Sequence, residues 1–231
     1  MSEISENLAR VREGIETAAL RCGRDLLKVR LVAVIKTVEA ERVRQAISAG
    51  VKILGENYVQ EAQKKIEILG LNVAWHFIGH LQTNKAKAAV HLFDLIHSVD
   101  SLNLAKELNK QAQQQGKVLP VLLQVNLSGE TTKFGAREKE IFQVIEELSA
   151  MEGLLVKGLM TMPPYFEDPE ASRPYYVELR KLGERLAQQK LSRISIEELS
   201  MGMSNDFEVA IEEGATLVRV GTAIFGARPP K

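Results

Sequence analysis

A lysine closes the first apolar run of the chain, and this position suits amine chemistry. The run LVAVIK covers residues 31–36, so Lys36 follows five aliphatic residues that should be buried. Burial disfavours the charged form of a lysine and lowers its affinity for a proton. The uncharged amine can condense with an aldehyde to give a Schiff base. The simpler alternative is that Lys36 only marks the point where the chain leaves the core.

A second candidate group, late in the sequence, has the composition of an anion-binding cradle. Gly202 and Ser204 precede an expected helix, and Asn205 and Glu208 have the spacing of a capping box. The first turn of a helix offers unpaired backbone N–H groups that suit a phosphate. In the simpler alternative, Ser204 and Asn205 cap the helix and bind nothing.

The last apolar run, LVRVGTAIFG at residues 217–226, extends this cradle. Gly221 lets a backbone approach closely, and Thr222 adds a hydroxyl and an N–H, although Gly221 could also be a simple bend in the chain. An aldehyde that also carries a phosphate is pyridoxal 5′-phosphate. A lysine and an anion cradle at one site therefore point to this cofactor.

Arg219 is the candidate partner of the pyridine nitrogen, a role that arginine or aspartate fills in such sites. A permanently charged arginine donates a hydrogen bond but does not protonate the ring, so the cofactor would stay a weak electron sink. The alternative for Arg219 is an ion pair with Glu197 or Glu198 at the rim of the fold.

Other basic residues compete with Lys36 less well. Lys85 and Lys133 fall in expected loops or helices, and Lys157 lies early in its apolar run, away from the expected site. The pair Lys64 and Lys65 stands beside acids and amides in a helical pattern, which is typical of a solvated helix face. Lys36 is therefore the predicted nucleophile.

The histidines do not form a metal site by their spacing. His76 and His80 are four residues apart, but their segment is an expected strand and loop, so they would not share a helix face as a zinc pair does. We interpret His91 and His97 as surface or packing residues. No metal site is predicted.

The elements that must bring these candidates together are eight strand-then-helix signals, which follow a first amphipathic helix, MSEISENLARVREGIETAAL. This alternation implies a parallel sheet, and continuous aliphatic runs imply strands covered on both faces. Eight units close a (β/α)8 barrel, so we predict an α/β fold, a single TIM barrel with an extra N-terminal helix over residues 1–231. A doubly wound open sheet is the competing architecture, but no G-x-G-x-x-G motif follows the first run. The expected strands cover residues 31–36, 52–56, 74–79, 95–100, 118–126, 154–162, 196–202 and 217–226.

In such a barrel the carboxyl ends of the strands build the site, and a phosphate often lies after the seventh and eighth strands. The candidate residues all occupy such ends. The sequence therefore places Lys36 and the anion cradle at the same mouth of the barrel.

The composition excludes several other classes of protein. Lysine plus arginine equals aspartate plus glutamate at 30 each, so the charge balance argues against a nucleic-acid binder. A single cysteine, Cys22, excludes an internal disulfide and fits a reducing compartment. No apolar run approaches the roughly 20 residues that a membrane span needs. We expect a cytoplasmic protein that does not associate with membranes.

Seven ordered motifs resemble those of the pyridoxal phosphate homeostasis protein family. This family is similar to the barrel domain of alanine racemase standing alone, and the resemblance covers essentially the whole chain. The motifs are AVIKT (33–37), GENYVQE (55–61), WHFIGHLQTNK (75–85), QVN (124–126), GLMTMPP (158–164), SMGMSNDFEVAI (200–211) and VRVGTAIFG (218–226).

The resemblance implies a set of cofactor-binding residues. Lys36 would carry the Schiff base and Arg219 would lie by the pyridine nitrogen. The resemblance also implies that Asn57 lies close to the cofactor. Phosphate contacts would come from the segment that starts at Ser200 and ends at Ser204, and from Gly221 and Thr222.

The resemblance also implies a function without established catalysis: the protein would hold pyridoxal phosphate and serve vitamin B6 and amino-acid homeostasis. Related racemases take a second base, a tyrosine, from a partner's β-domain, and the chain ends five residues after Gly226, so we expect no such domain. None of Tyr58, Tyr165, Tyr175 or Tyr176 is clearly placed to replace that base. We expect a monomer, with apoenzymes that need the cofactor as possible partners.

Two other functions remain open from the residues. One is a pyridoxal-phosphate-dependent amino-acid racemase. The other is a cofactor-free Schiff-base aldolase in which Ser204, Gly221 and Thr222 hold a sugar phosphate.

Overall fold

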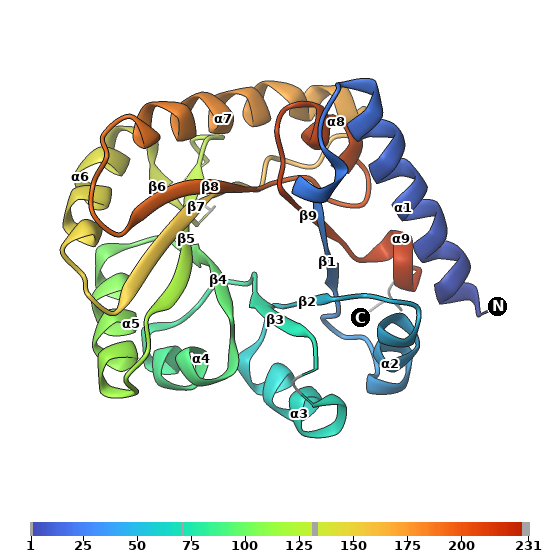
Figure 1. Ribbon diagram of the computed structural model, residues 1–231, viewed down its shortest axis with the longest axis horizontal. Helices are drawn as coiled ribbons and strands as arrows, with labels where there is room; N and C mark the ends of the chain where they lie inside the picture. The colour runs from blue at the N-terminus through green and yellow to red at the C-terminus, as the bar shows by residue number, and fades with distance from the viewer. Residues whose placement is uncertain (1, 71, 131–133, 228–231) are drawn as a thin grey trace.

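The computed structural model describes residues 2–70, 72–130 and 134–227 and contains a closed ring of eight parallel strands (Figure 1). β1 pairs with β2 on one side and with β9 on the other, and the β4–β5 pairing completes the ring. A two-residue strand, β6 (Ala136–Arg137), pairs with β5 outside the ring. The ring strands are β1 (Arg30–Val34), β2 (Ile53–Glu56), β3 (Ala74–Phe77), β4 (Leu95–Val99), β5 (Leu119–Asn126), β7 (Leu154–Met160), β8 (Ile194–Ser200) and β9 (Leu217–Val220).

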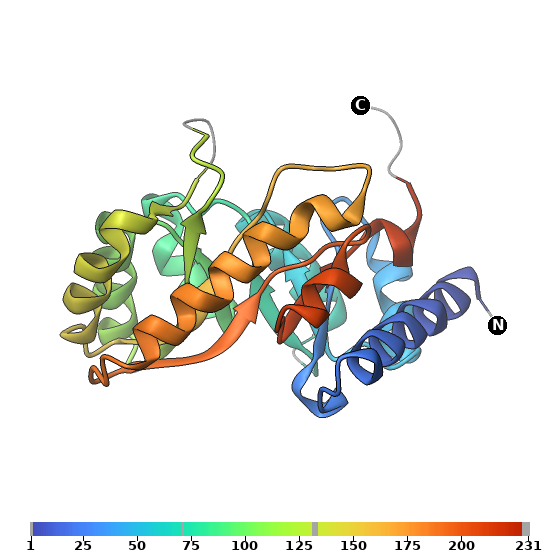
Figure 2. The same cartoon turned by 90° about the horizontal axis from the view of Figure 1, so that it is seen from above.

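Helices follow the strands and cover the outside of the ring, so the predicted (β/α)8 barrel with an N-terminal helix is confirmed (Figures 1 and 2). No helix in the described ranges is both long and apolar enough for a transmembrane span. The α-helices are α1 (Glu3–Arg21), α2 (Ala40–Ser48), α3 (Val59–Leu69), α4 (Ala86–Leu92), α5 (Leu102–Gln114), α6 (Glu138–Ser149), α7 (Arg173–Ala187), α8 (Phe207–Glu212) and α9 (Thr222–Phe225). The 3-10 turns in the described part of the chain are η1 (Leu26–Lys28), η2 (Thr83–Lys85) and η3 (Pro169–Ser172).

The last predicted strand is partly wrong. The structure ends β9 at Val220, and the residues after Gly221 form the short helix α9 rather than continuing the strand. The apolar character of Ala223, Ile224 and Phe225 made the run appear continuous, but Ile224 and Phe225 are buried from a helix. The chain therefore turns at Gly221, directly at the mouth of the barrel.

The N-terminal helix α1 covers the part of the ring where the following helices are shortest. α8 has six residues and α9 has four, and α1 contacts both of them. The Asn7 side chain donates to the carbonyl of Ile224 at 3.0 Å, which satisfies a group at the end of α9. The apolar residues that α1 buries have helical spacing: Ile4, Leu8, Val11, Ile15, Ala18 and Ala19.

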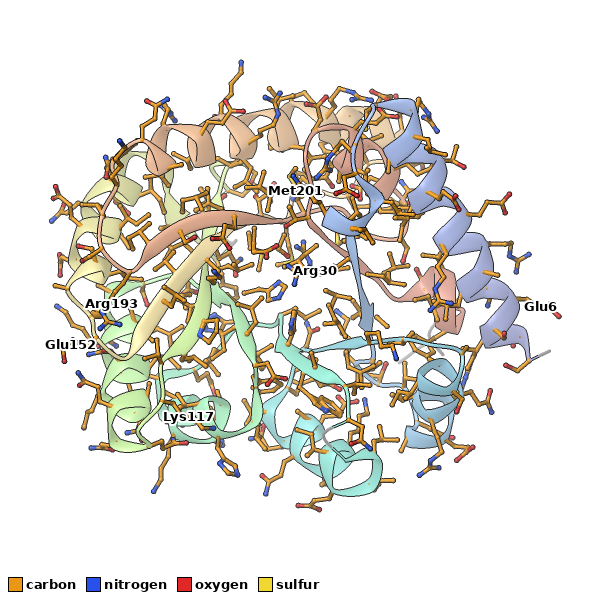
Figure 3. The ribbon with its side chains drawn as sticks, viewed as in Figure 1. Glu6, Arg30, Lys117, Glu152, Arg193 and Met201 are labelled. Carbon is orange, nitrogen blue, oxygen red and sulfur yellow. The ribbon has the colours of Figure 1, made fainter. Side chains whose placement is uncertain are left out.

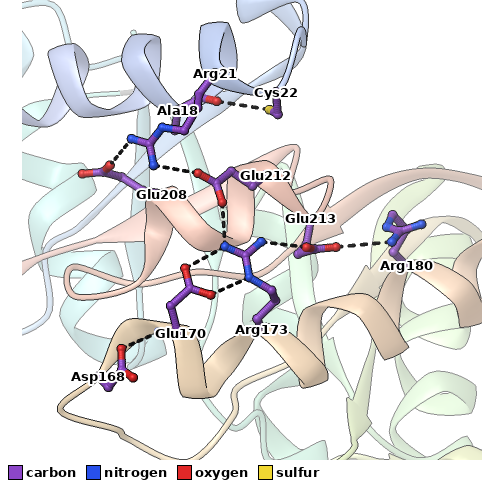
Figure 4. A network of polar contacts seen from close by, with 10 residues as sticks. All are labelled: Ala18, Arg21, Cys22, Asp168, Glu170, Arg173, Arg180, Glu208, Glu212 and Glu213. Atoms are coloured by element: carbon purple, nitrogen blue, oxygen red, sulfur yellow. Dashed lines mark hydrogen bonds and ion pairs between the residues drawn. The ribbon is translucent and has the colours of Figure 1, made fainter.

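Ion pairs join α1, α7 and α8 on the outer surface (Figure 4). Arg173 contacts Glu212 and Glu213 at 2.7 Å each, and Arg21 contacts the same Glu212 at 2.8 Å. Isolated surface pairs contribute little, but here two carboxylates that are largely covered each bridge two arginines. The network fixes the short helix α8 between its two longer neighbours.

A glycine in β7 lets two strands of the ring approach closely. The pairings of β7 with both β5 and β8 shift register between Val156 and Gly158. A side-chain carbon added at Gly158 would lie 1.9 Å from the carbonyl oxygen of Glu198 in β8. The neighbouring backbone cannot retreat without breaking the strand pairing.

We predict that Gly158→Ala lowers the free energy of unfolding by about 3 kcal/mol, the upper end of the cost of overpacking, because the clash is with backbone. Gly116→Ala is the matched control, since Gly116 has φ +64 but nothing lies near the added carbon. The control should lose only about 1 kcal/mol, the cost of a left-handed residue. Urea denaturation of both variants measures the difference, and equal losses would contradict the assigned clash.

Candidate cofactor-binding site

A cavity of about 230 Å³ opens at the carboxyl ends of the strands. It brings together Lys36, Arg219 and Gly221, which belong to the two ends of the sequence. Six of the seven predicted site residues line it, and Ser200 is the exception. The lining residues are Val34, Lys36, Asn57, Ile78, Met162, Tyr165, Met203, Ser204, Asn205, Asp206, Arg219, Gly221 and Thr222.

Lys36 lies two residues after the end of β1, in the turn that leads to α2. The backbone N–H of Val38 donates to the carbonyl of Ile35 at 3.0 Å and closes this turn. Lys36 is half-buried and its side chain lines the cavity. The residue that the first apolar run singled out therefore reaches the same space as the anion cradle.

The cradle is built from backbone N–H groups that converge on one point. Gly221 and Ala223 both donate to the hydroxyl oxygen of Ser204, at 3.2 and 3.4 Å. An oxygen atom at this position thus receives two donors from the turn after β9, and a phosphate oxygen has the same requirement. An anion would take these donors only in place of the Ser204 hydroxyl, so the anion cradle stays a prediction.

The predicted capping box at Asn205 and Glu208 is wrong. Asp206 is the N-cap residue of α8, and its Oδ1 accepts the backbone N–H of Met203 at 2.7 Å. Ser172 donates to the other carboxylate oxygen at 2.9 Å. Asp206 therefore orders the loop before α8, while Asn205 donates from its side chain to the carbonyl of Phe166.

Arg219 is buried, with 3% of its surface exposed, and its guanidinium has neutral acceptors. It donates to the Ser200 hydroxyl at 2.6 Å and to the Thr161 carbonyl at 2.9 Å. Burial lowers the pKa of Arg219 to about 10, and the nearby Tyr176 and Asp206 oppose that shift. The side chain remains a cation at neutral pH.

The alternative ion pair of Arg219 with a rim glutamate is wrong. Glu197 pairs with Lys157 at 2.8 Å, and Glu198 pairs with Arg30 and accepts from the Thr216 hydroxyl. Both carboxylates are therefore engaged elsewhere.

A chain of buried histidines runs below Arg219 through the inside of the ring. His97 is hydrogen-bonded to Ser200 at 2.8 Å and to His76 at 3.0 Å. Figure 3 shows Arg30 directed into the same ring of strands, and its charge lowers the pKa of both histidines. Burial is the larger cause: it brings the pKa of His76 to about 3 and holds that of His97 well below its usual value. Both imidazole rings are therefore neutral, and they form a hydrogen-bonded chain from Ser200 through His97 to His76 inside the ring of strands.

Asn57 follows β2 and lines the cavity, and one of its side-chain atoms lacks a hydrogen-bond partner within the described residues. Its Oδ1 is buried and has no hydrogen-bond partner among the residues that the structure describes. A carbon added at Gly79 would lie 2.3 Å from the Asn57 carbonyl oxygen, so the glycine is needed for this backbone to pass. A buried polar atom without a partner in a residue that lines a cavity is one feature of a site that a ligand completes.

Several residues of the site were not predicted from sequence. Met162, Tyr165 and Met203 line the cavity and supply an apolar wall. Figure 2 shows the segment between β7 and η3, which carries Tyr165, rising over the end of the barrel. Methionines and aromatic residues are more often part of a core, so their types did not indicate a site. The only sequence signal that could have identified them was their position at or after the ends of expected strands.

Neither Lys85 nor Lys157 lines this cavity. Lys85 lines a separate pocket beside His80 and Gln82, Lys157 is paired with Glu197, and Lys133 lies outside the described residues. Within the described ranges no group of histidine, cysteine and acidic side chains could hold a metal ion. Lys65, predicted to be on a solvated face, is instead 6% exposed and paired with two glutamates.

Comparison with known sequences identifies close relatives. The model of the alanine racemase N-terminal domain family matches residues 6–229. The chain is 47% identical over 224 residues to a pyridoxal phosphate homeostasis protein of Aquifex aeolicus, covering 96% of this chain and 97% of that protein. It is 41% identical over 232 residues to the protein of the same name in Escherichia coli K12, covering 99% and 98%.

Solved structures agree with this result. PipY of Synechococcus elongatus, solved with PLP bound, shares 36% identity at a TM-score of 0.85 and covers 96% of this chain and 100% of that one. Alanine racemase of Clostridium difficile shares 17% identity at a TM-score of 0.75, covering 100% of this chain but 58% of the racemase. The similarity to the racemase concerns the barrel fold alone.

The buried neutral histidines predict how stability depends on pH. Below about pH 6.5 an unfolded histidine takes up a proton, whereas His76 and His97 stay neutral in the fold, so the unfolded state binds more protons. The free energy of unfolding should therefore decrease as the pH is lowered below about 6.5, by up to about 1.4 kcal/mol per pH unit for each histidine. Urea denaturation between pH 7.5 and 5.5 measures this slope.

The variant His76→Gln should roughly halve the slope, and the same change at the exposed His91 should leave the slope intact. A flat profile for the wild-type protein would contradict the assignment.

Proposed function

The chain belongs to the pyridoxal phosphate homeostasis protein family, and from this premise we propose that its cavity binds pyridoxal 5′-phosphate. The single observation that carries the proposal is that Lys36, Arg219 and the Gly221 turn line one cavity. A homologue, PipY, was solved with PLP bound. The cofactor's aldehyde supplies an electrophile with which a lysine amine condenses, with loss of water.

Each functional group of the ligand has a counterpart among these residues. The Lys36 amine would bind the aldehyde. The phosphate would replace the Ser204 hydroxyl as the acceptor for the N–H groups of Gly221 and Ala223, with the hydroxyls of Ser204 and Thr222 beside it. Arg219 donates to the ring nitrogen and keeps its own proton, since its pKa is near 10. Asn57 lines the cavity on the β2 side and would lie close to the ring.

Ser200 has an indirect role in this proposal. It is fully buried and lies between Arg219 and His97, outside the wall of the cavity. We therefore assign Ser200 to holding the guanidinium in place rather than to the phosphate. A Ser200→Ala variant is expected to weaken the arginine's position and not the anion cradle.

We further propose that the protein stores and supplies the cofactor within the cell and does not turn over a substrate. Asp206 lines the cavity, but both of its oxygens accept hydrogen bonds from the protein. Arg219 makes the bound cofactor a weak electron sink, because it does not protonate the ring. At the rim, Met162 and Tyr165 are 40% and 76% exposed, so the cavity opens towards solvent and towards any apoenzyme that accepts the cofactor.

One observation favours a second candidate function, amino-acid racemisation. Proton transfer on both faces of a substrate requires a second acid–base group besides Lys36, and Tyr165 places a phenol at the edge of the cavity. Exchange of the α-hydrogen of amino acids for deuterium, lost in Tyr165→Phe, would support this function. Absence of exchange over a broad panel of amino acids would favour storage.

We predict that borohydride reduction of the protein with pyridoxal phosphate attaches about one cofactor per chain to Lys36, because that amine lines the cavity together with the cradle. Lys36→Ala should lose this attachment and the accompanying absorbance. Mass spectrometry of the digested protein identifies the modified lysine. Lys64→Ala, which removes an exposed lysine, is the control and should bind the same amount of cofactor as the wild-type protein. If borohydride attached a sugar phosphate but not the cofactor to Lys36, the proposal would be overturned in favour of an aldolase.

A further inference from the structure

A buried ion cluster lies directly behind Lys36. The Lys65 ammonium, from α3, contacts Glu56 Oε1 at 2.8 Å and Glu61 Oε1 at 2.6 Å. Its third acceptor is the backbone carbonyl of Ile35. Three acceptors use the three hydrogens of an ammonium group, so the cluster is complete and Lys65 is not a rival for the cofactor's aldehyde.

The two carboxylates of this cluster hold the backbone on either side of the site residues. Glu56 Oε2 accepts the N–H of Asn57 at 2.6 Å, and Glu61 Oε1 accepts the N–H of Thr37 at 2.7 Å. With the bond from Lys65 to Ile35, the cluster contacts both neighbours of Lys36. It also contacts the amide of Asn57, the other candidate residue on this side of the cavity.

The turn that carries Lys36 needs such support. The bond from Val38 to Ile35 makes Lys36 and Thr37 the two central residues, and Thr37 has φ +63. A turn with positive φ at its third residue favours glycine, and a β-branched residue there is strained. Thr37 keeps this conformation only where surrounding contacts hold it. Its N–H is held by Glu61, and its hydroxyl donates to the carbonyl of Lys36 at 2.6 Å.

General stabilisation does not explain where the cluster lies. Burial raises the pKa of Glu56, and the bond and charge of Lys65 together with the Asn57 amide oppose the shift, so the buried carboxylate is costly to keep ionised. A buried ion pair can often be replaced by apolar residues without loss of stability. Apolar residues could not supply an acceptor for the amides of Thr37 and Asn57.

We propose that Lys65, Glu56 and Glu61 are positioning residues that fix the strained turn at Thr37 and thereby direct the Lys36 amine into the cavity. The inference rests on the proposed function, since it assigns these residues to the lysine that would bind pyridoxal phosphate. Loss of the contact to Thr37 lets the turn relax, so that only a fraction of the molecules present Lys36 correctly. The apparent dissociation constant rises as that fraction falls.

Glu61→Ala is the main test, because its side chain is 26% exposed and truncation there leaves the buried pair of Lys65 and Glu56 intact. It should weaken the binding of pyridoxal phosphate about tenfold, the effect of releasing a strain of the usual size. Glu61→Gln keeps an oxygen for the Thr37 amide and should stay near the wild-type affinity. Adding Thr37→Gly to Glu61→Ala removes the strain and should restore most of the affinity. Lys64→Met, on the exposed side of the same helix, is the matched control.

Two further measurements separate positioning from general damage. Inorganic phosphate should protect the site against labelling by pyridoxal phosphate. This protection reports the state of the anion cradle and should be equal in all variants. Reductive methylation with formaldehyde reports the Lys36 amine without the cofactor. The rate of methylation of Lys36, relative to that of Lys64 in the same sample, should rise in Glu61→Ala. It should return to the wild-type value in the double variant.

Unchanged affinity and methylation in Glu61→Ala would overturn the inference. So would a loss that Thr37→Gly does not rescue or that includes weaker phosphate protection. If pyridoxal phosphate labels no variant but the methylation rates show the expected order, the proposed function fails while the positioning role stands.

Discussion

The pairing of β1 with β9 is the interaction on which the site depends. It joins the two ends of the sequence in register, with Ala33 opposite Val220, and so closes the ring. Lys36 lies three residues beyond this pair on one strand, and Gly221 lies one residue beyond it on the other. Neither the lysine nor the anion cradle is a site alone, and parallel pairing of these two strands places both at one mouth. α1 packs on the short helices after β8 and β9 and protects the closure from outside.

Continuous aliphatic runs and glycines are the features from which the sequence predicts structure best. Most of the ring strands are buried along most of their length, so their apolar runs could be recognised without any tertiary information. β8 is the exception, because it contains Glu197 and Glu198 and is only partly buried. Lys36, Arg219 and Gly221 could be found because their positions are set by the ends of those runs. The error at residues 222–225 has the same origin, since an apolar helix turn and a buried strand have the same composition.

Polar groups inside the fold could not be predicted in this way. His97 was interpreted as a surface or packing residue, and Lys65 as part of a solvated face, because neither reveals its partners in its own neighbourhood. His97 meets Ser200 across 103 residues, and Lys65 reaches the carbonyl of Ile35 across 30. Both contacts join elements that only the fold brings together, and neither follows from local spacing. Both also lie directly behind a predicted site residue, where exact orientation of a side chain is required.

The choice of neutral partners for Arg219 has a consequence for the site. A carboxylate beside the guanidinium would satisfy it but would also cancel the charge that faces the cavity. Here the nearest acidic residue of β8, Glu198, is drawn to Arg30 and Thr216, and Arg219 is held by a hydroxyl and a carbonyl. The hydroxyl is in turn held by His97, which burial keeps neutral. The guanidinium is thus held by neutral hydrogen-bond partners and not by a direct ion pair, so that it can also donate to the ring of the proposed cofactor.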